Sequence, residues 1–418
     1  MRLNLIAFIA CVVIVAGCTE SAHIQTGSYK FLYDFESRDL HPEYVVYHDS
    51  DDSSKVYFRI YSKELLYTRN SSMAPFVSRI AIKTYISDAQ GNLQDTLTFK
   101  VNDAAKPAEG WLLGDFKVPL GIGNWNVTFE FTDLARNVSQ INYVNADKSS
   151  NYTGQNYLLL KYETGEPVFG GFVSSGQKVE VISARNEDAG RPQLLRLSGE
   201  LKLPPPPFST NAPEITGLTG ATGADIKINT AGVYSFVVAS GNYFVTHDEN
   251  VRTGLTILTA STFYPEIREV ESLQWPLRYI TTKTEHDEIV KNNYPKKMID
   301  QFWIECAGNK EHAREMISIY YHRVEEANKY FSSFTEGWRT DRGMIHLIFG
   351  NPSKINRFGD SETWQYGEEG TAGLLMFVFR RVESPLSNNI YVLDRDPNFK
   401  PYWEKMVQTW RNGRVYSE

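Results

Sequence analysis

The apolar residues of this chain follow one spacing up to about residue 260 and another from about residue 284. In the first part, apolar and polar residues alternate within short β-prone stretches, and each stretch ends in turn residues. Within 123–131, for example, Trp125, Val127, Phe129 and Phe131 fall on one face of a strand. In the second part, apolar residues recur every three or four positions, as they do between 311 and 334. The chain therefore combines β domains with a later, helix-containing module.

We expect two β-sandwich domains of immunoglobulin-like type, at 28–147 and 155–260. Short strands separated by Gly, Asn and Asp turns are typical of such sandwiches. The aromatic content of 13% agrees, because aromatic side chains suit half-buried pleated surfaces. Four consecutive prolines at 204–207 form a stiff, extended segment. This segment is either a rigid spacer between strands or a docking peptide for a proline-binding partner.

For 284–418 we expect an α+β module, with helices packed on a small, mainly antiparallel sheet. The segment before it, 275–280, is expected to be extended. A helix begins near Thr284, Pro295 interrupts it, and Asn309 caps the next long helix. The expected strands are 344–349, 364–366, 374–379 and 389–393, and a helix at 402–410 ends the chain.

One heptapeptide joins the long helix to the first of these strands. It consists of Gly337, Trp338, Arg339, Thr340, Asp341, Arg342 and Gly343. An aromatic ring, two guanidiniums, a carboxylate and two glycines in so short a segment indicate a backbone corner held by charges. We expect Gly337 to leave the helix in a left-handed conformation. We expect Asp341 to accept backbone N–H groups or to pair with Arg339, Arg342 or Arg323.

The heptapeptide and its flanks resemble the GWxTD-domain family of bacterial proteins. The similarity lies in Gly337, Trp338, Thr340 and Asp341, and continues in Arg342-Gly343, Gly350-Asn351-Pro352, Phe302-Trp303, the segment 321–331 and the segment 362–366. It covers roughly 284–418. Members of this family are typically exported proteins of Bacteroidota-like bacteria with β-rich N-terminal regions. The resemblance thus implies export but carries no assigned reaction.

The N-terminus predicts export by itself. Arg2 precedes an apolar run that ends at Val15-Ala16-Gly17-Cys18, which indicates a signal peptide at 1–17. The run is too short to span a membrane, which takes about 20 apolar residues. The site resembles the bacterial lipobox, so we expect Cys18 to carry acyl chains such as palmitate, with 18–27 as a tether. The alternative is ordinary secretory cleavage with an incidental cysteine. We expect an outer-membrane protein that faces the periplasm.

The remaining cysteines and the charge exclude other classes. Cys11 lies in the removed segment, so Cys306 is the one thiol left in the folded part and no disulfide framework is possible. We expect Cys306 to be a packing thiol. The alternative is a reactive thiol, which requires a cationic neighbour such as Lys310 or His312. The net charge of −7 argues against a nucleic-acid partner.

The sequence favours a non-enzymatic binding or assembly component of the cell envelope that acts through its C-terminal module. The expected partner is an envelope protein or a glycan, without a cofactor or metal, because no recognised catalytic motif or metal-ligand spacing occurs. Residues 337–343 are then structural or binding residues. The alternative is an envelope hydrolase or glycan-binding protein. That alternative uses Asp341, Glu362 and His346, with Arg339 and Arg342 beside them and His346 on a strand.

Overall fold

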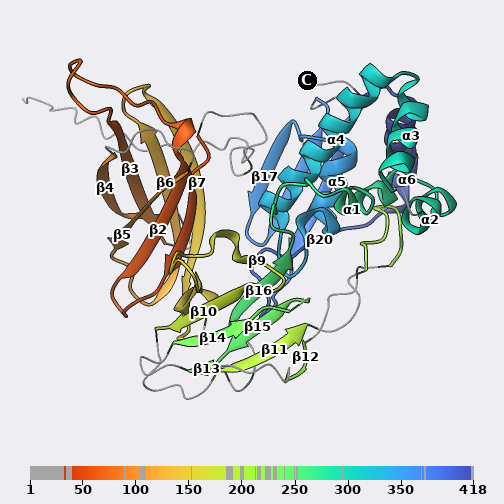
Figure 1. Cartoon of the computed structure of the whole chain (residues 1–418). Coiled ribbons are helices and arrows are strands. Elements are labelled where there is room, and N and C mark those ends of the chain that lie inside the picture. The colour runs from red at the N-terminus through yellow and green to blue at the C-terminus, as the bar shows by residue number, and fades with distance from the viewer. Residues whose placement is uncertain are drawn as a thin grey trace, which may run out of the picture.

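The computed structural model describes residue 33 and residues 40–415, apart from 89–90, 104–109, 152, 185–191, 198–201, 212, 214–217, 222–226, 229–232, 240, 249, 251–252, 293–294, 369 and 371–372. Across these residues the protein is mainly β, with five sheets and six α-helices that all belong to the C-terminal part (Figure 1). The expected succession of strands and then helices is therefore confirmed. Cys18, the signal segment 1–17 and the tether 18–27 lie outside the described residues.

Two antiparallel sheets form the N-terminal unit. One has the order β1-β2-β5 and the other β4-β3-β6-β7. Their strands are β1 (Glu43–Tyr47), β2 (Ser54–Tyr61), β3 (Ser78–Ser87), β4 (Leu93–Asp103), β5 (Trp111–Val118), β6 (Gly123–Asp133) and β7 (Val138–Lys148). Both sheets contribute side chains to one hydrophobic cluster, in which Phe58 meets Phe131. As expected, Val127, Phe129 and Phe131 of β6 are buried on one face.

Two further sheets form the middle unit. Their orders are β13-β14-β10-β8 and β12-β11-β15-β16-β9, and β9 pairs with β16 in parallel. The strands are β8 (Tyr157–Lys161), β9 (Phe172–Ser174), β10 (Lys178–Ser183), β11 (Gln193–Leu197), β12 (Leu218–Ala221), β13 (Lys227–Ile228), β14 (Tyr234–Val237), β15 (Tyr243–Thr246) and β16 (Leu255–Ala260). A second cluster, which includes Val181, Phe236 and Ile257, fills the space between them.

The helices begin after β16. They are α1 (Val270–Leu273), α2 (Lys283–Lys291), α3 (Pro295–Ala307), α4 (Lys310–Phe331), α5 (Asp341–Phe349) and α6 (Lys400–Arg411). Thr282 starts α2 with a capping box to Glu285, and the Asn309 side chain caps α4 by accepting from the His312 N–H. The expected cap at Asn309 is confirmed, and α3 begins at the predicted Pro295.

An antiparallel sheet of four strands completes the C-terminal unit, in the order β17-β18-β19-β20. Its strands are β17 (Lys354–Phe358), β18 (Ser361–Tyr366), β19 (Leu375–Arg381) and β20 (Tyr391–Leu393). One large hydrophobic cluster joins this sheet to α3, α4, α5 and α6 and contains the buried Trp303, Trp364 and Trp410. The C-terminal unit thus has a single core between helices and sheet.

Two expected elements are wrong. The segment 344–349 is part of α5 and not a strand, so His346 lies on a helix. The physical reason is that Met344, Ile345, Leu347 and Ile348 are all fully buried, and a continuous apolar run fits a buried helix as well as a buried strand. The segment 275–280 is not extended, because a 3-10 turn occupies Pro276–Tyr279.

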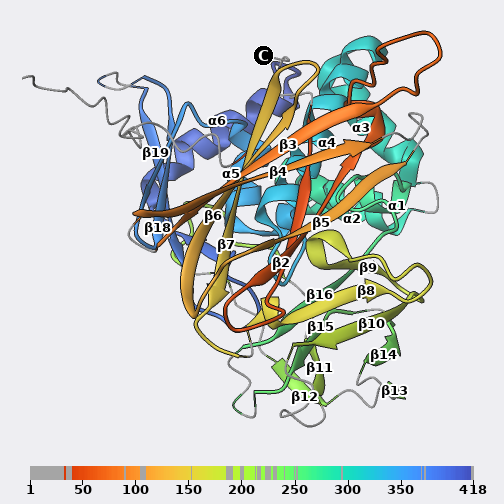
Figure 2. The same ribbon diagram turned by 90° about the vertical axis from the view of Figure 1, so that its left-hand side faces the viewer.

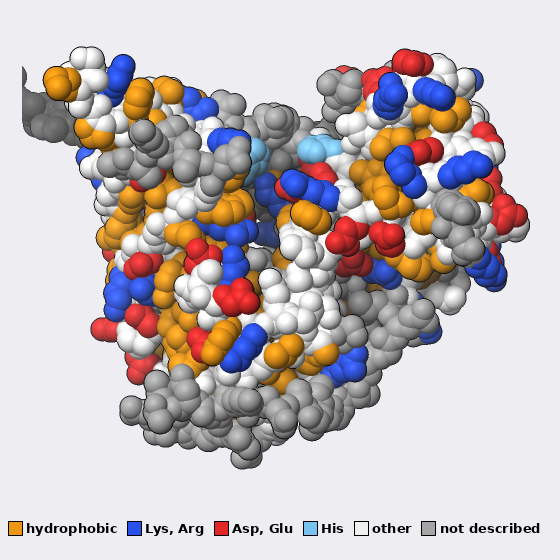
Figure 3. Space-filling model, viewed as in Figure 1, with side chains coloured by type: hydrophobic (Ala, Val, Ile, Leu, Met, Phe, Trp, Pro, Cys, Tyr) orange, Lys and Arg blue, Asp and Glu red, His pale blue; other side chains and the backbone are white. Residues whose placement is uncertain are grey.

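The three units contact one another. The N–H of His48 donates to the carbonyl of Gln155, which links the N-terminal and middle units. Asn242 of the middle unit donates to the carbonyl of Phe334, and a small apolar cluster containing Phe244 and Leu386 covers the same junction. Figure 2 shows the N-terminal sheets in front of the helices, and Figure 3 shows the surface hollowed between these two lobes.

Candidate functional site

The GWxTD segment packs backbone against backbone. A methyl group on Gly337 would lie 1.8 Å from the carbonyl oxygen of Ala327 in α4, and one on Gly343 would lie 2.0 Å from the carbonyl oxygen of Gly337. Neither glycine has a positive φ, so the expected left-handed exit at Gly337 is wrong. The reason is that α4 already ends at Phe331, and Gly337 opens a separate 3-10 turn, Gly337–Arg339. These glycines allow close approach and not an unusual backbone conformation.

Thr340 turns the chain into α5. Its hydroxyl accepts from the N–H of Gly343 at 3.1 Å and donates to the carbonyl of Gly337 at 2.8 Å. It is therefore the N-cap of α5, a position at which Thr is favoured. Asp341 follows in the first turn, where the helix dipole favours a negative charge.

Trp338 closes the core at this corner and is 3% exposed. Its backbone N–H donates to the side-chain oxygen of Asn328 at 3.3 Å, and its carbonyl accepts from the Tyr279 hydroxyl at 3.0 Å. The guanidinium of Arg339 covers the indole at 4.5 Å and pairs with Glu336 at 2.6 Å. Trp338 and Arg339 thus belong to the packing of the corner.

Asp341 pairs with a residue that the sequence analysis did not consider. Its carboxylate binds the guanidinium of Arg395 through two oxygens, one of them 3.0 Å from Nη1, and accepts from the N–H of Leu393 at 2.8 Å. Of the two alternatives expected for Asp341, acceptance of a backbone N–H is confirmed, whereas pairing with Arg339, Arg342 or Arg323 is wrong, because the partner is Arg395. Burial raises the pKa of Asp341 above its usual value, and Arg395 opposes this shift.

Arg395 also holds the proline run. It donates to the carbonyl of Pro205 at 2.9 Å, and the N–H of Asp396 donates to the carbonyl of Pro207 at 3.1 Å. Pro204 and Pro207 are buried, and the neighbouring Leu203 and Phe208 pack against the core of the C-terminal unit. The run thus lies against this chain's own domain and connects Asp341 to the middle unit.

Arg342 belongs to a second network. Its side chain is 1% exposed, donates to the carbonyl of Asn389 at 3.0 Å and lies 3.8 Å from the carboxylate of Glu362. Glu362 is fully buried and also accepts from the indole N–H of Trp364. Between the two charges lies the hydroxyl of Tyr33, which comes from the N-terminal end of the described chain. Burial raises the pKa of Tyr33 far above its usual value, so the phenol stays neutral.

His346 belongs to a third network. It faces α4 from α5 and is fully buried, with Nε2 at 3.0 Å from a carboxylate oxygen of Glu326. Burial lowers the pKa of His346. Asp341, Glu362 and His346, the candidates for acid–base chemistry, therefore lie in separate internal networks, each with its own partners.

Sequence reasoning missed Arg395, Asn389, Glu326 and Tyr33. The hydrogen bond from the Leu393 N–H to Asp341 spans 52 positions, and that from Tyr33 to Glu362 spans 329, so spacing along the chain gives no signal for either. The position of Glu326 carries no local signal either, because it lies about 200° around α4 from the buried Val324. It is buried because His346 of α5 packs against it.

Cys306 is a partly buried thiol in α3. Burial raises its pKa to about 11, and Arg411 is the cationic group that opposes the shift, not Lys310 or His312. The thiol is therefore protonated at neutral pH, which agrees with a packing role.

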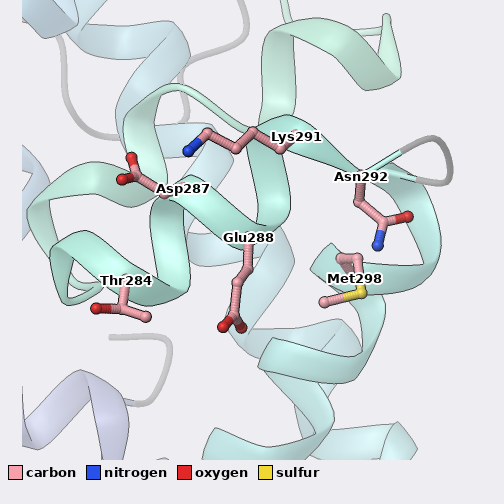
Figure 4. Close-up of a pocket in the computed structure, with 6 residues that line it drawn as sticks. All are labelled: Thr284, Asp287, Glu288, Lys291, Asn292 and Met298. Carbon is pink, nitrogen blue, oxygen red and sulfur yellow. The ribbon is translucent and has the colours of Figure 1, made fainter.

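One pocket in the C-terminal unit lies away from the GWxTD corner, between α2 and α3 (Figure 4). Its lining residues are Thr284, Asp287, Glu288, Lys291, Asn292 and Met298. None of the seven motif residues lines it, and it is mostly surrounded by exposed side chains. In the described part of the chain, no group of three or more His, Cys, Asp or Glu residues is arranged to hold a metal ion. Nor is any helix in that part both long and apolar enough to cross a membrane.

The fold and the corner define an α+β domain built around a Gly-Trp-x-Thr-Asp turn. Residues 241–412 match the family model of the GWxTD domain, the family that the motif predicted. The matched region includes β15 and β16 of the middle unit. No curated protein matches the sequence.

Among solved structures, one similar chain is a calcium-binding mutant of the Bacteroides uniformis beta-glucuronidase 2. The identity is 9% and the TM-score 0.17, over 32% of this chain and 15% of that one. This chain thus spans a small part of that protein, and a similarity of this size supports no conclusion about fold or function.

Proposed function

We propose that this protein is a lipoprotein of the bacterial cell envelope that acts as a non-enzymatic binding or assembly component through its GWxTD domain. Cys18, after a signal peptide at 1–17, would carry the acyl anchor, and the protein would face the periplasm from the outer membrane. The two N-terminal β units would be immunoglobulin-like sandwiches that act as spacers. The partner would be another protein of the envelope.

The observation that supports a non-enzymatic role is the burial of the domain's candidate acid and base side chains. Asp341, Glu362 and His346 are 3%, 0% and 0% exposed, and each has an internal partner. An acid or base must come within hydrogen-bond reach of the group that it protonates or deprotonates. Groups so enclosed are better suited to fixing the shape of a domain than to meeting a substrate.

A partner would meet other side chains. The tryptophans of the C-terminal unit are mostly in its core, since Trp303, Trp338, Trp364, Trp403 and Trp410 are at most 8% exposed. Two apolar side chains on its sheet are open to solvent instead, namely Phe358 at 88% and Met376 at 50%. Met376 lies between the buried Leu375 and Phe377 of β19, so it points away from the helices. Exposed apolar residues of this size are common at protein interfaces.

The anchor is tested by fractionation of cells that produce the Cys18→Ser variant. We expect it to leave the membrane fraction, while the Cys11→Ser variant, altered within the removed segment, stays with the membrane. If the Cys18→Ser variant stays as well, the lipoprotein assignment is wrong.

The binding role is tested by capture of the tagged protein from detergent-solubilised envelope. We expect one stoichiometric protein partner. Its recovery should fall with Phe358→Asp or Met376→Asp and stay unchanged with Lys354→Asp on the same sheet. Turnover of an envelope substrate without any protein partner would contradict the proposal.

A further inference from the structure

We propose that the GWxTD domain contains a binding pocket for a tyrosine side chain, and that its ligand is the segment of this chain that carries Tyr33. Tyr33 is 7% exposed and lies in the core of the C-terminal unit, although it precedes the first strand of the N-terminal unit. The pocket is distinct from the Asp341–Arg395 corner. The proposal is independent of acylation at Cys18 and of the partner protein.

The walls of the pocket are aromatic. The ring of Tyr33 lies 5.8 Å from that of Tyr330, 5.1 Å from Phe331 and 6.1 Å from Trp364, with tilted or edge-on geometry. Such arrangements are the favoured ones for aromatic pairs. All three walls belong to the matched GWxTD region, so the domain itself provides the enclosure for a planar ring.

The floor of the pocket fits a hydroxyl group. The Tyr33 hydroxyl donates to Glu362 Oε2 at 2.8 Å and accepts from Arg342 Nη1 at 2.7 Å. Arg357 Nη2 lies 3.4 Å from the same carboxylate oxygen. A group that donates one hydrogen bond and accepts another satisfies both Glu362 and Arg342. The hydroxyl of a phenol is such a group, and it lies at the end of a planar ring. A phenylalanine leaves both without that partner, and a phosphorylated tyrosine brings negative charge against Glu362.

The domain fixes these floor residues without help from Tyr33. Arg342 is held by the carbonyl of Asn389 at 3.0 Å and stacks on the ring of Tyr391 at 4.0 Å. Glu362 is held by the indole N–H of Trp364. Groups positioned in advance bind a ligand with less loss of conformational freedom. The pocket is therefore built as a receptor.

The chain is also anchored at Leu40. Leu40, seven positions later, is 1% exposed in the core of the N-terminal unit. Tyr33 and Leu40 thus lie in the cores of two different units. Because Tyr33 belongs to the same chain as the pocket, its effective concentration there is high, on the order of millimolar. A free peptide competes poorly with it as long as Tyr33 is in place.

The test uses the full chain with Tyr33→Ala and a fluorescent peptide with the sequence of residues 28–39, followed by fluorescence anisotropy. We expect saturable one-to-one binding to the variant and binding at least about tenfold weaker to the wild-type chain, whose pocket is filled. A peptide with Tyr33→Phe should bind about tenfold or more weakly, since it lacks both hydrogen bonds to charged groups. A folded Tyr33→Ala chain that does not bind the peptide would overturn the proposal, as would equal binding of the Tyr33→Phe peptide.

If Tyr33→Ala prevents folding, a second experiment tests the proposal. A protease site is inserted after Ser37 in the otherwise wild-type chain, and the folded protein is cleaved. We expect the released N-terminal piece to stay with the remainder in gel filtration and to be displaced by the 28–39 peptide but not by its Tyr33→Phe form. Immediate separation of the two pieces would refute the proposal.

Discussion

Replacement of Asp341 by alanine tests whether the GWxTD corner is a structural device. Asp341 and Arg395 have side chains that are 1% and 6% exposed, so Asp341→Ala leaves a guanidinium buried without its carboxylate and the N–H of Leu393 without its acceptor. Breaking a buried ion pair in this way costs about 3–5 kcal/mol. For a domain of this size, that corresponds to a fall in melting temperature of roughly 6–20 °C.

A matched control lies in the same domain. Asp394 pairs with Arg380 at 2.8 Å, but these side chains are 45% and 65% exposed. Asp394→Ala should therefore cost about 0–1 kcal/mol. Thermal unfolding followed by tryptophan fluorescence reports on this domain, because five buried tryptophans lie in its core.

A double variant completes the cycle. Asp341→Leu combined with Arg395→Met removes both charges, and we expect it to recover part of the stability that Asp341→Ala loses. Equal shifts for Asp341→Ala and Asp394→Ala would refute the reasoning, because burial would then make no difference to the pair.

Three further predictions address other parts of the domain. Gly337→Ala should destabilise it by about 1–3 kcal/mol or more in urea unfolding, since the added methyl group meets the backbone of Ala327, whereas Gly121→Ala, with open space around it, should change little. The pKa of His346 is lowered by burial, so its contribution to stability is complete above the unfolded value of about 6.5 and is lost as the pH falls from there towards the folded pKa. The free energy of unfolding, measured at a series of pH values, should fall by up to about 1.4 kcal/mol per pH unit below pH 6.5. We expect a smaller slope for His346→Gln and an unchanged slope for His322→Gln, whose side chain is exposed. Because burial raises the pKa of Cys306 to about 11, iodoacetamide at pH 8 should label it slowly in the folded chain and rapidly in urea; fast labelling of the folded chain would contradict the packing role.

Sequence patterns were reliable where one face of an element is polar. β6 alternates between buried and open positions, and α4 has a polar stripe, so each has a spacing that only one type of element satisfies. Sequence patterns predicted the wrong element type for α5, because its residues are almost all buried and the run 344–349 has no polar face. The cap at Thr340 was the local signal for a helix there, since Thr at this position is followed by an acid in the first turn.

The sequence by itself determined the order of β units and helices, the resemblance to the GWxTD family and the presence of a charged corner at 337–343. Only the tertiary structure decided which charges meet. Asp341 binds Arg395, Glu362 and Arg342 share Tyr33, and His346 binds Glu326. Element type follows from neighbours a few positions apart, whereas these pairs join residues brought together by the packing of separate elements in one core.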